Sequence, residues 1–179
     1  MLGIASLVIE DGGSEREAIA AMILDALGDG EMPITELREE FGKKVAKLVA
    51  RSLADRPGTG VDPHTLDTHS WKEQRELYLD GLEQDDDERV VRLAAADTLR
   101  EVRALVVDLR RHGSIAFARF ATPPNDQLEW YRSLLAVLTR RMARGHLVQE
   151  LRGVITEMER LVELDTATAA WRVAHVDAA

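Results

Sequence analysis

Three aspartates have the residue type and spacing that metal or acid–base chemistry requires. Asp25 lies in an otherwise apolar helical stretch, and Asp29 follows at i+4, so both carboxylates share one side if helical geometry persists to the helix end. Asp97 continues a stripe on which helical spacing predicts an apolar residue. Because burying an unpaired carboxylate is costly, such acids are normally paired with a cation, hydrogen-bonded or bound to a metal. Asp25 and Asp97 could therefore share one site.

A structural explanation accounts for the same residues. Asp97 could pair with Arg100 or Arg103, which follow it on the same helix, and Asp25 could help to end its own helix. Ion pairs of this kind are common on protein surfaces and need no ligand. The spacing alone does not decide between a ligand site and structural ion pairs.

The elements that must position these acids are predicted to be helices. Ser14-x-x-Glu17 has the form of a capping box and opens a helix that runs to about Leu27. Gly42 separates two short helices, and Gly113 ends a long helix with a basic last turn. Apolar spacing predicts helices over about 35–41, 45–53, 70–82, 88–111, 128–142 and 147–162, with an exposed loop over 55–69.

Composition favours a single helical domain. A chain of 179 residues with 45% apolar residues can bury one sizeable core. Only 4% of the residues are aromatic, whereas Ala, Leu, Glu and Arg recur, which favours helix over sheet. We therefore predict an all-α fold: a single-domain helical bundle over residues 1–163, followed by a C-terminal tail over 164–179.

Charge and cysteine content narrow the classes of partner. A net charge of −9 argues against broad nucleic-acid binding, which depends on an excess of Lys and Arg. The chain has no Cys, so disulfides and thiolate metal sites are excluded. The apolar run 1–9 lacks a basic n-region and is too short to span a bilayer. The sequence thus predicts a cytoplasmic protein that binds neither nucleic acid nor a membrane.

Several segments, in order and at matching spacing, carry a resemblance to a known family. They are Ala18-Ile-Ala-Ala-Met-Ile-Leu-Asp-Ala-Leu-Gly-Asp29, Phe41-Gly-x-x-Val-Ala-x-Leu-Val49, Trp71-Lys-Glu-x-x-Glu-x-Tyr78, Leu93-Ala-Ala-Ala-Asp97 and Asp108-Leu-Arg-Arg-His-Gly113. To about residue 163 the chain resembles the bacterial HD-domain phosphohydrolases, particularly the guanosine tetraphosphate hydrolase branch of stringent-response enzymes. The resemblance implies a helical bundle of the HD-domain type.

The resemblance also implies a site. In that family a divalent metal, often manganese, is held by an N-terminal His, a His-Asp pair and a distant Asp, and it activates water to attack a phosphorus. Asp25 and Asp97 match two of these metal ligands. Asp29 matches the second acid of a Glu-Asp pair that assists the water, and so is the candidate catalytic residue. Arg103 matches a position of small stand-alone members and is the candidate substrate-binding residue.

The departures from the family pattern concern the same site. Leu24 stands where the family has the His of His-Asp, and Leu cannot coordinate a metal. Gly28 replaces the Glu of the Glu-Asp pair and removes a candidate general base. Thr98 and Glu101 replace a Lys and an Asn that help to place substrate in the family. At most two of the four ligands are present, so manganese or magnesium is expected to bind weakly or not at all.

Met1 aligns with an apolar family position directly after the N-terminal ligand His. We therefore expect the reading frame upstream of Met1 to be open, to encode another helix and to have a His codon directly before it. An in-frame stop codon just upstream would refute this expectation.

These features predict a catalytically impaired phosphohydrolase relative that binds a nucleotide or a protein partner. One alternative is an active metal-dependent phosphohydrolase that acts on a (pyro)phosphorylated nucleotide such as guanosine tetraphosphate. The other is a purely structural or dimerising domain, and a homo-oligomer is compatible with the sequence. Leu24 separates these readings: a side chain that fills the old cavity favours the structural role, and a cavity that persists beside it favours binding.

Overall fold

The computed structural model describes residues 2–27, 32–54, 68–120, 122–143 and 145–175. Within these ranges the chain forms seven α-helices and one 3₁₀ helix and contains no strand, which confirms the predicted all-α fold. The helices are α1 (Leu2–Glu10), α2 (Glu15–Leu27), α3 (Ile34–Leu53), α4 (Thr68–Gln84), α5 (Glu88–His112), η1 (Gly113–Arg119), α6 (Pro124–Arg141) and α7 (His146–His175). None of the described helices is both long enough and apolar enough to cross a bilayer.

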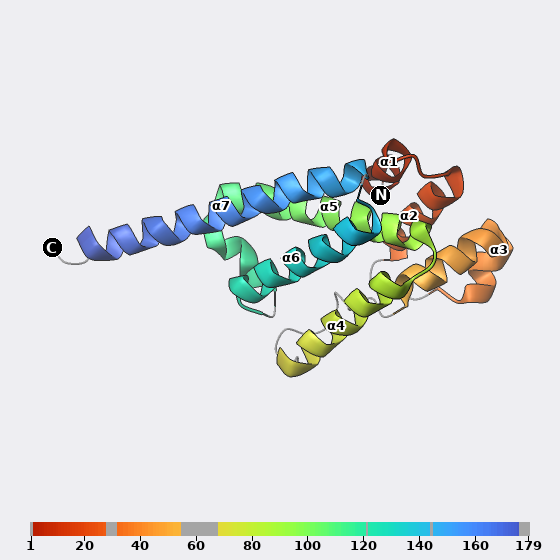
Figure 1. Cartoon of the computed structure of the whole chain (residues 1–179), viewed down its shortest axis with the longest axis horizontal. Helices are drawn as coiled ribbons and strands as arrows, with labels where there is room; N and C mark the ends of the chain where they lie inside the picture. The colour runs from red at the N-terminus through yellow and green to blue at the C-terminus, as the bar shows by residue number, and fades with distance from the viewer. Residues whose placement is uncertain (1, 28–31, 55–67, 121, 144, 176–179) are drawn as a thin grey trace.

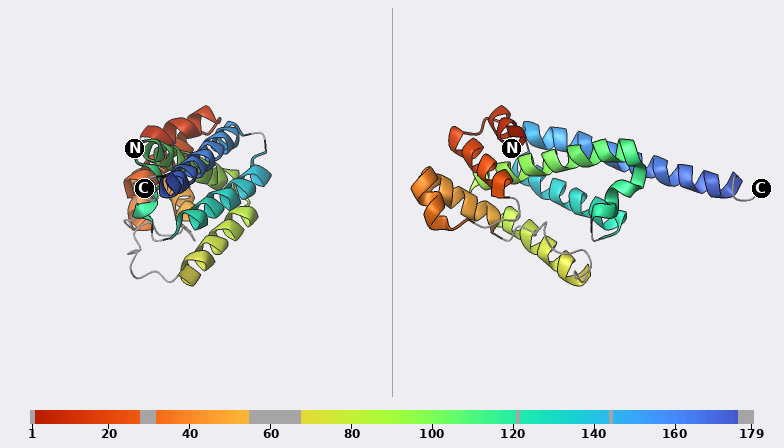
Figure 2. Two further views of the ribbon diagram at one scale, coloured as in Figure 1. Left: turned by 90° about the vertical axis from the view of Figure 1, so that its left-hand side faces the viewer. Right: turned by 180° about the vertical axis from the view of Figure 1, so that it is seen from behind.

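The helix α5 lies at the centre of the arrangement. It packs against α1, α2, α3, α6 and α7, while α4 runs alongside α6. Helices α1, α2 and α3 gather at one end of the molecule, and α7 extends away from that end along α5 (Figures 1 and 2). Because α5 is surrounded on most sides, it buries more residues than a helix with a single apolar stripe would. Its buried residues are Val90, Val91, Leu93, Ala94, Ala95, Ala96, Thr98, Leu99, Val102, Leu105, Val106 and Leu109.

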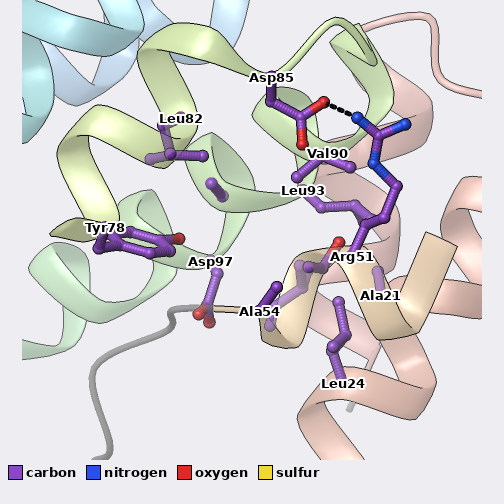
Figure 3. Close-up of a pocket in the computed structure, with 14 residues that line it drawn as sticks. Ala21, Leu24, Arg51, Ala54, Tyr78, Leu82, Asp85, Val90, Leu93 and Asp97 are labelled. Carbon is purple, nitrogen blue, oxygen red and sulfur yellow. Dashed lines mark hydrogen bonds and ion pairs between the residues drawn. The ribbon is translucent and has the colours of Figure 1, made fainter.

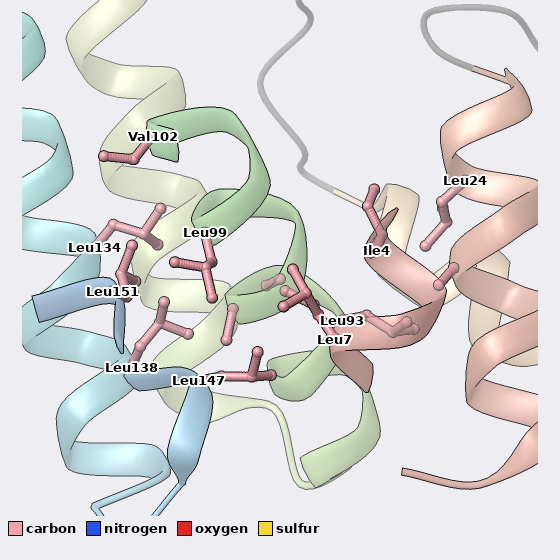
Figure 4. Close-up of a cluster of buried hydrophobic side chains, with 14 of the residues drawn as sticks. Ile4, Leu7, Leu24, Leu93, Leu99, Val102, Leu134, Leu138, Leu147 and Leu151 are labelled. Carbon is pink, nitrogen blue, oxygen red and sulfur yellow. The ribbon is translucent and has the colours of Figure 1, made fainter. Parts of the chain in front are cut away.

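One continuous apolar core joins both ends of the bundle. Leu99 and Val102 of α5 meet Leu134 and Leu138 of α6 and Leu151 of α7 in the cluster shown in Figure 4. Towards the other end, Ile4 and Leu7 of α1, Leu24 of α2 and Leu93 of α5 belong to the same cluster. This core fixes the position of α2 relative to α5, which are the helices that carry Asp25 and Asp97.

The capping box predicted at the start of α2 is present. The Ser14 backbone N–H donates to Glu17 Oε2 at 2.8 Å, the Ser14 hydroxyl donates to the same oxygen at 2.7 Å, and the Glu17 N–H donates to Ser14 Oγ at 3.4 Å. Arg92 of α5 also donates to Glu17. Burial opposes the charged form of Glu17, but the hydrogen bonds from Ser14 and Arg92 outweigh it and lower the pKa of this carboxyl group.

Two glycines act as the sequence predicted. Gly42 interrupts α3 with φ 82° and ψ 159°, so the helix consists of two pieces that meet at a kink. Gly113 follows α5 with φ 61°, and its N–H donates to the Leu109 carbonyl. Both positions need a positive φ, which glycine adopts without the strain that a Cβ would cause.

Two predicted boundaries differ from the structure. The loop predicted over 55–69 falls largely outside the described residues, and α4 already begins at Thr68. The last helix carries the predicted apolar stripe, but it continues to His175 and projects beyond the other helices (Figures 1 and 2). Asp165 anchors the middle of this helix, because its Oδ2 accepts hydrogen bonds from the backbone N–H, at 2.9 Å, and the hydroxyl of Ser114.

Candidate functional site

A cavity of about 140 Å³ lies where α2, α3, α4 and α5 meet, with Ile4 of α1 at its edge. Its wall is mostly apolar and includes Leu82, Val90 and Leu93. Figure 3 shows the side chains that line it, drawn from helices distant in the sequence. The cavity therefore exists because several helices pack around α5, and no single segment of the chain forms it.

Leu24 and Asp97 both line this cavity. Leu24 is 8% exposed and contributes an apolar wall from α2, while Asp97 and Tyr78 contribute polar groups from α5 and α4 (Figure 3). The Leu24 side chain thus borders the space without filling it. Leu24 could have filled the cavity or left it open, and in the structure the cavity persists beside Leu24.

Asp25 and Asp97 converge on the same cation. Nη2 of Arg100 lies 3.7 Å from Oδ1 of Asp25 and 3.3 Å from Oδ1 of Asp97. Arg100 follows Asp97 at i+3 on α5, and this spacing places the two side chains on one face of the helix. The expected proximity of the two acids is therefore present, and so is the predicted pairing of Asp97 with Arg100.

Of the other two predicted site residues, the structure describes only Arg103, and Arg103 does not line this cavity. Asp29 lies outside the described residues, as does Gly28. Arg103 pairs with Glu150 of α7, on a face of α5 that does not line the cavity. The described site therefore consists of Asp25, Arg100 and Asp97 beside the cavity.

Comparison with known proteins identifies the family and the fold. A family model described as an HD domain matches residues 1–124, which include α1 to α5 and both acids. This chain belongs to the HD-domain family. The 1.85 Å crystal structure of lmo0812 from Listeria monocytogenes EGD-e has a similar fold, with a TM-score of 0.69 and 19% sequence identity, over 88% of this chain and 96% of that chain. No match was found among curated proteins.

HD domains generally bind a divalent metal ion, which needs several oxygen or nitrogen donors around it. Within the described ranges no group of three or more His, Asp or Glu side chains is placed to hold a metal. Asp25 and Asp97 offer oxygen donors, but the guanidinium of Arg100 already lies between them. Leu24, beside Asp25, adds no donor. The described residues of this HD domain therefore do not fit a resident metal.

The HD domain has a second polar contact near the cavity mouth. Arg51 of α3 donates to Asp85 at 2.5 Å and to Asp86 at 2.6 Å, and both Arg51 and Asp85 line the cavity (Figure 3). The hydrogen bond to Asp86 raises the pKa of the Arg51 guanidinium, which stays charged. Beside this pair, the Ser52 hydroxyl lines the cavity and is buried without a hydrogen-bond partner among the described residues.

Glu101 forms a further polar group that sequence reasoning noted only as a departure from the family pattern. Burial raises the pKa of its carboxyl group, nearby Asp97 adds to that shift, and the Tyr131 hydroxyl, which donates to Glu101, partly opposes it. Burial also raises the pKa of Tyr131 and lowers that of Arg75, the cation that faces Glu101 from α4. The i+4 spacing of Asp97 and Glu101 was the available sequence signal, since it places both on one face of α5.

Two tryptophans surround Arg75. The guanidinium carbon lies 4.9 Å from the ring centroid of Trp71 and 4.2 Å from that of Trp130. Cation–π contacts of this kind stabilise a positive charge that has lost part of its hydration. The contact with Trp130 joins α4 to α6, and α4 also carries Tyr78 to the cavity wall.

Proposed function

We propose that this HD domain is a catalytically impaired relative of the guanosine tetraphosphate hydrolases and that it binds a nucleotide in the cavity beside Leu24. The observation that carries the proposal is the coexistence of an open cavity with an acid pair held by Arg100. The cavity supports ligand binding, and Arg100 argues against activation of water by a metal at the two acids. The family resemblance of the motifs supports the choice of ligand class.

The size and lining of the cavity indicate which part of a nucleotide enters it. A volume of about 140 Å³ is smaller than the roughly 300–1,000 Å³ of a complete small-molecule site, so it accommodates only a part of the ligand. Asp97 places a carboxylate at the cavity wall, which disfavours a phosphate there, whereas its oxygens can accept the N–H groups of a purine base. Tyr78 adds an aromatic ring, on which a base can stack. We infer that the base enters and that the phosphates stay outside.

A specific observation argues against each of the competing functions. A protein partner needs no internal cavity, so the cavity favours the small ligand. A purely structural domain would gain stability by filling the space, because voids lose packing contacts. The buried hydroxyl of Ser52 also favours a ligand, since it has no hydrogen-bond partner among the residues that the structure describes, and such a group calls for a hydrogen-bonding species. An active phosphohydrolase would need a free acid pair, and Arg100 bridges Asp25 and Asp97.

Titration calorimetry with guanosine tetraphosphate, with and without manganese, tests the proposal. We expect saturable binding that manganese does not strengthen, and no release of pyrophosphate in either condition. Leu24→Trp should fill the cavity and abolish binding, whereas Met22→Trp, at a 40% exposed position of the same helix, should not. Tyr78→Ala should weaken binding about 5- to 150-fold through loss of the stacking surface.

Three results would contradict the proposal. If titration with guanosine tetraphosphate gave no saturable binding signal, the proposal that the cavity binds this class of nucleotide would be wrong. Equal binding by the Leu24→Trp and Met22→Trp variants would show that the nucleotide binds elsewhere on the protein. Manganese-dependent pyrophosphate release by the unmodified protein would establish the active enzyme instead.

A further inference from the structure

We propose that Arg100 is a built-in cation of this HD domain: among the described residues, its guanidinium takes the place of a divalent metal as a counter-charge of Asp25 and Asp97. The domain then neither needs a metal to fold nor retains one at these acids. This inference concerns the acid pair and does not depend on whether a nucleotide binds in the cavity.

The geometry supports an electrostatic role. A single nitrogen, Nη2 of Arg100, lies within 4 Å of a carboxylate oxygen of each acid, at 3.7 Å for Asp25 and 3.3 Å for Asp97. The side chains of Asp25 and Asp97 are 14% and 27% exposed, so water screens their mutual repulsion only in part. Arginine keeps its charge at every pH at which the protein is folded. It therefore provides permanently the positive charge that a bound ion would provide only when present.

The same geometry makes Arg100 and a metal mutually exclusive. A divalent ion that bridges the two Oδ1 atoms must lie about 2.0–2.6 Å from each of them, and Nη2 of Arg100 lies within 4 Å of both, so the ion and this nitrogen would compete for the same space. An ion beside the guanidinium would meet a like charge at short range. Metal binding therefore requires the Arg100 side chain to leave, and its 46% exposure shows that solvent is available to receive it.

A second acid pair in the same chain is held in the same way. Arg92, two turns earlier on α5, contacts Asp11 through Nε at 3.2 Å and also pairs with Glu17. That bridge joins the α1–α2 connection to α5, and the Arg100 bridge joins the end of α2 to α5. Both contacts tie α2 to α5, so charge pairing by arginine is a repeated means of assembling this end of the fold.

The experiment measures thermal unfolding with manganese and with a chelator in five proteins. The unmodified protein should melt at the same temperature in both. Arg100→Gln should expose the acid pair to manganese, with a dissociation constant on the order of 10⁻³ M. Its melting temperature should rise by about 3–6 °C when manganese is about ten times that constant. Arg100→Lys keeps a positive charge and should not respond.

Arg110→Gln is the matched control. Arg110 is on the same helix and lies 3.4 Å from Glu157, a single acid that also pairs with Arg160. Its loss should create no response to manganese. In the double variant Asp25→Asn/Arg100→Gln, the gained response should disappear, which would place the ion at the acid pair. Binding of manganese to these variants can be measured independently by its electron paramagnetic resonance signal.

Two outcomes would overturn the inference. A manganese response in the unmodified protein equal to that of Arg100→Gln would show that the guanidinium does not exclude the ion. No response in Arg100→Gln, with the fold intact by circular dichroism, would show that the two acids cannot hold a metal and that Arg100 replaces nothing. Neither outcome bears on nucleotide binding, because no nucleotide is present.

Discussion

The Asp11 carboxylate accepts a hydrogen bond from the backbone N–H of Leu147, at 3.1 Å, although the two residues are 136 positions apart in the chain. Leu147 lies in the first turn of α7, where backbone N–H groups have no partner inside the helix. Asp11 follows α1, so one side chain caps a helix from the opposite end of the sequence. Its other oxygen accepts from Arg92 at 3.2 Å. The start of α7 is thereby attached to α1 and α5.

Replacement of Asp11 by Ala should therefore destabilise the protein. The change removes a helix cap and one partner of Arg92, and we expect a loss of about 2–3 kcal/mol in the free energy of unfolding, measured by urea denaturation. Asp86→Ala is the control, because Asp86 is 90% exposed and Arg51 keeps Asp85 after its loss. Asp86→Ala should change stability little. Equal effects of the two substitutions would show that the cap on α7 contributes nothing.

Two Gly→Ala substitutions should change the stability of the protein in opposite directions. Gly42 has φ 82° and ψ 159°, a conformation that is almost confined to glycine, so Gly42→Ala should cost about 1–3 kcal/mol of stability. A Cβ at Gly42 would meet nothing within 4 Å, which makes the expected cost conformational and not steric. Gly153 lies exposed within α7 with equally open surroundings, and Gly153→Ala should stabilise by up to about 1 kcal/mol. Urea denaturation of both variants measures these changes in the free energy of unfolding. If Gly42→Ala left stability unchanged, the positive φ at the kink in α3 would be contradicted.

Glu101 should make stability fall as pH rises. Because its pKa is raised in the folded protein, chiefly by burial, the native state holds this proton more tightly than the unfolded state does. The stability that Glu101 contributes is fully present below its unfolded-state pKa of about 4.5. It is lost as pH rises through the higher pKa that this group has in the folded protein. Glu101→Gln mimics the neutral form and should melt above the unmodified protein at pH 8. The difference should shrink towards pH 4, and a constant difference would contradict burial of this carboxyl group.

A single substitution at Leu24 should not produce hydrolysis. Leu24→His supplies the missing imidazole of the family pattern, but Arg100 still bridges the acids and Gly28 still lacks the carboxylate that would assist the water. Pyrophosphate release from guanosine tetraphosphate with manganese should stay at background. Adding Gly28→Glu should bring at most slight activity, because water activation and metal capture fail at separate positions. Full activity of Leu24→His alone would refute the impaired-enzyme proposal.

Local patterns in the sequence determined most helix ends. Ser14 and Glu17 lie three residues apart, and the glycines at 42 and 113 act on their own backbone, so the interactions that stop or start these helices lie within one turn of the chain. The apolar stripes likewise indicated which face of each helix is buried, because burial follows helical periodicity. The all-α fold was predictable for this reason.

The length of the last helix could not be predicted from the local sequence and depends on tertiary contacts. No apolar stripe marks the chain after Asp165, so periodicity offered no reason to continue the helix. The contact of Asp165 with Ser114 joins α7 to η1, directly after α5, and supports the helix at that point. A contact between residues 51 positions apart has no signature in local sequence.

The site shows the same division. The sequence by itself determined that two acids lie on apolar helical stretches, that Leu24 offers no metal ligand, and that Arg100 or Arg103 could pair with Asp97. Only the packing of α2 against α5 decided that Arg100 reaches both acids, while Arg103 turns to Glu150 of α7. The cavity beside Leu24 also depends on how four helices meet. Volumes and ion pairs between distant segments arise from three-dimensional packing, which a one-dimensional pattern does not encode.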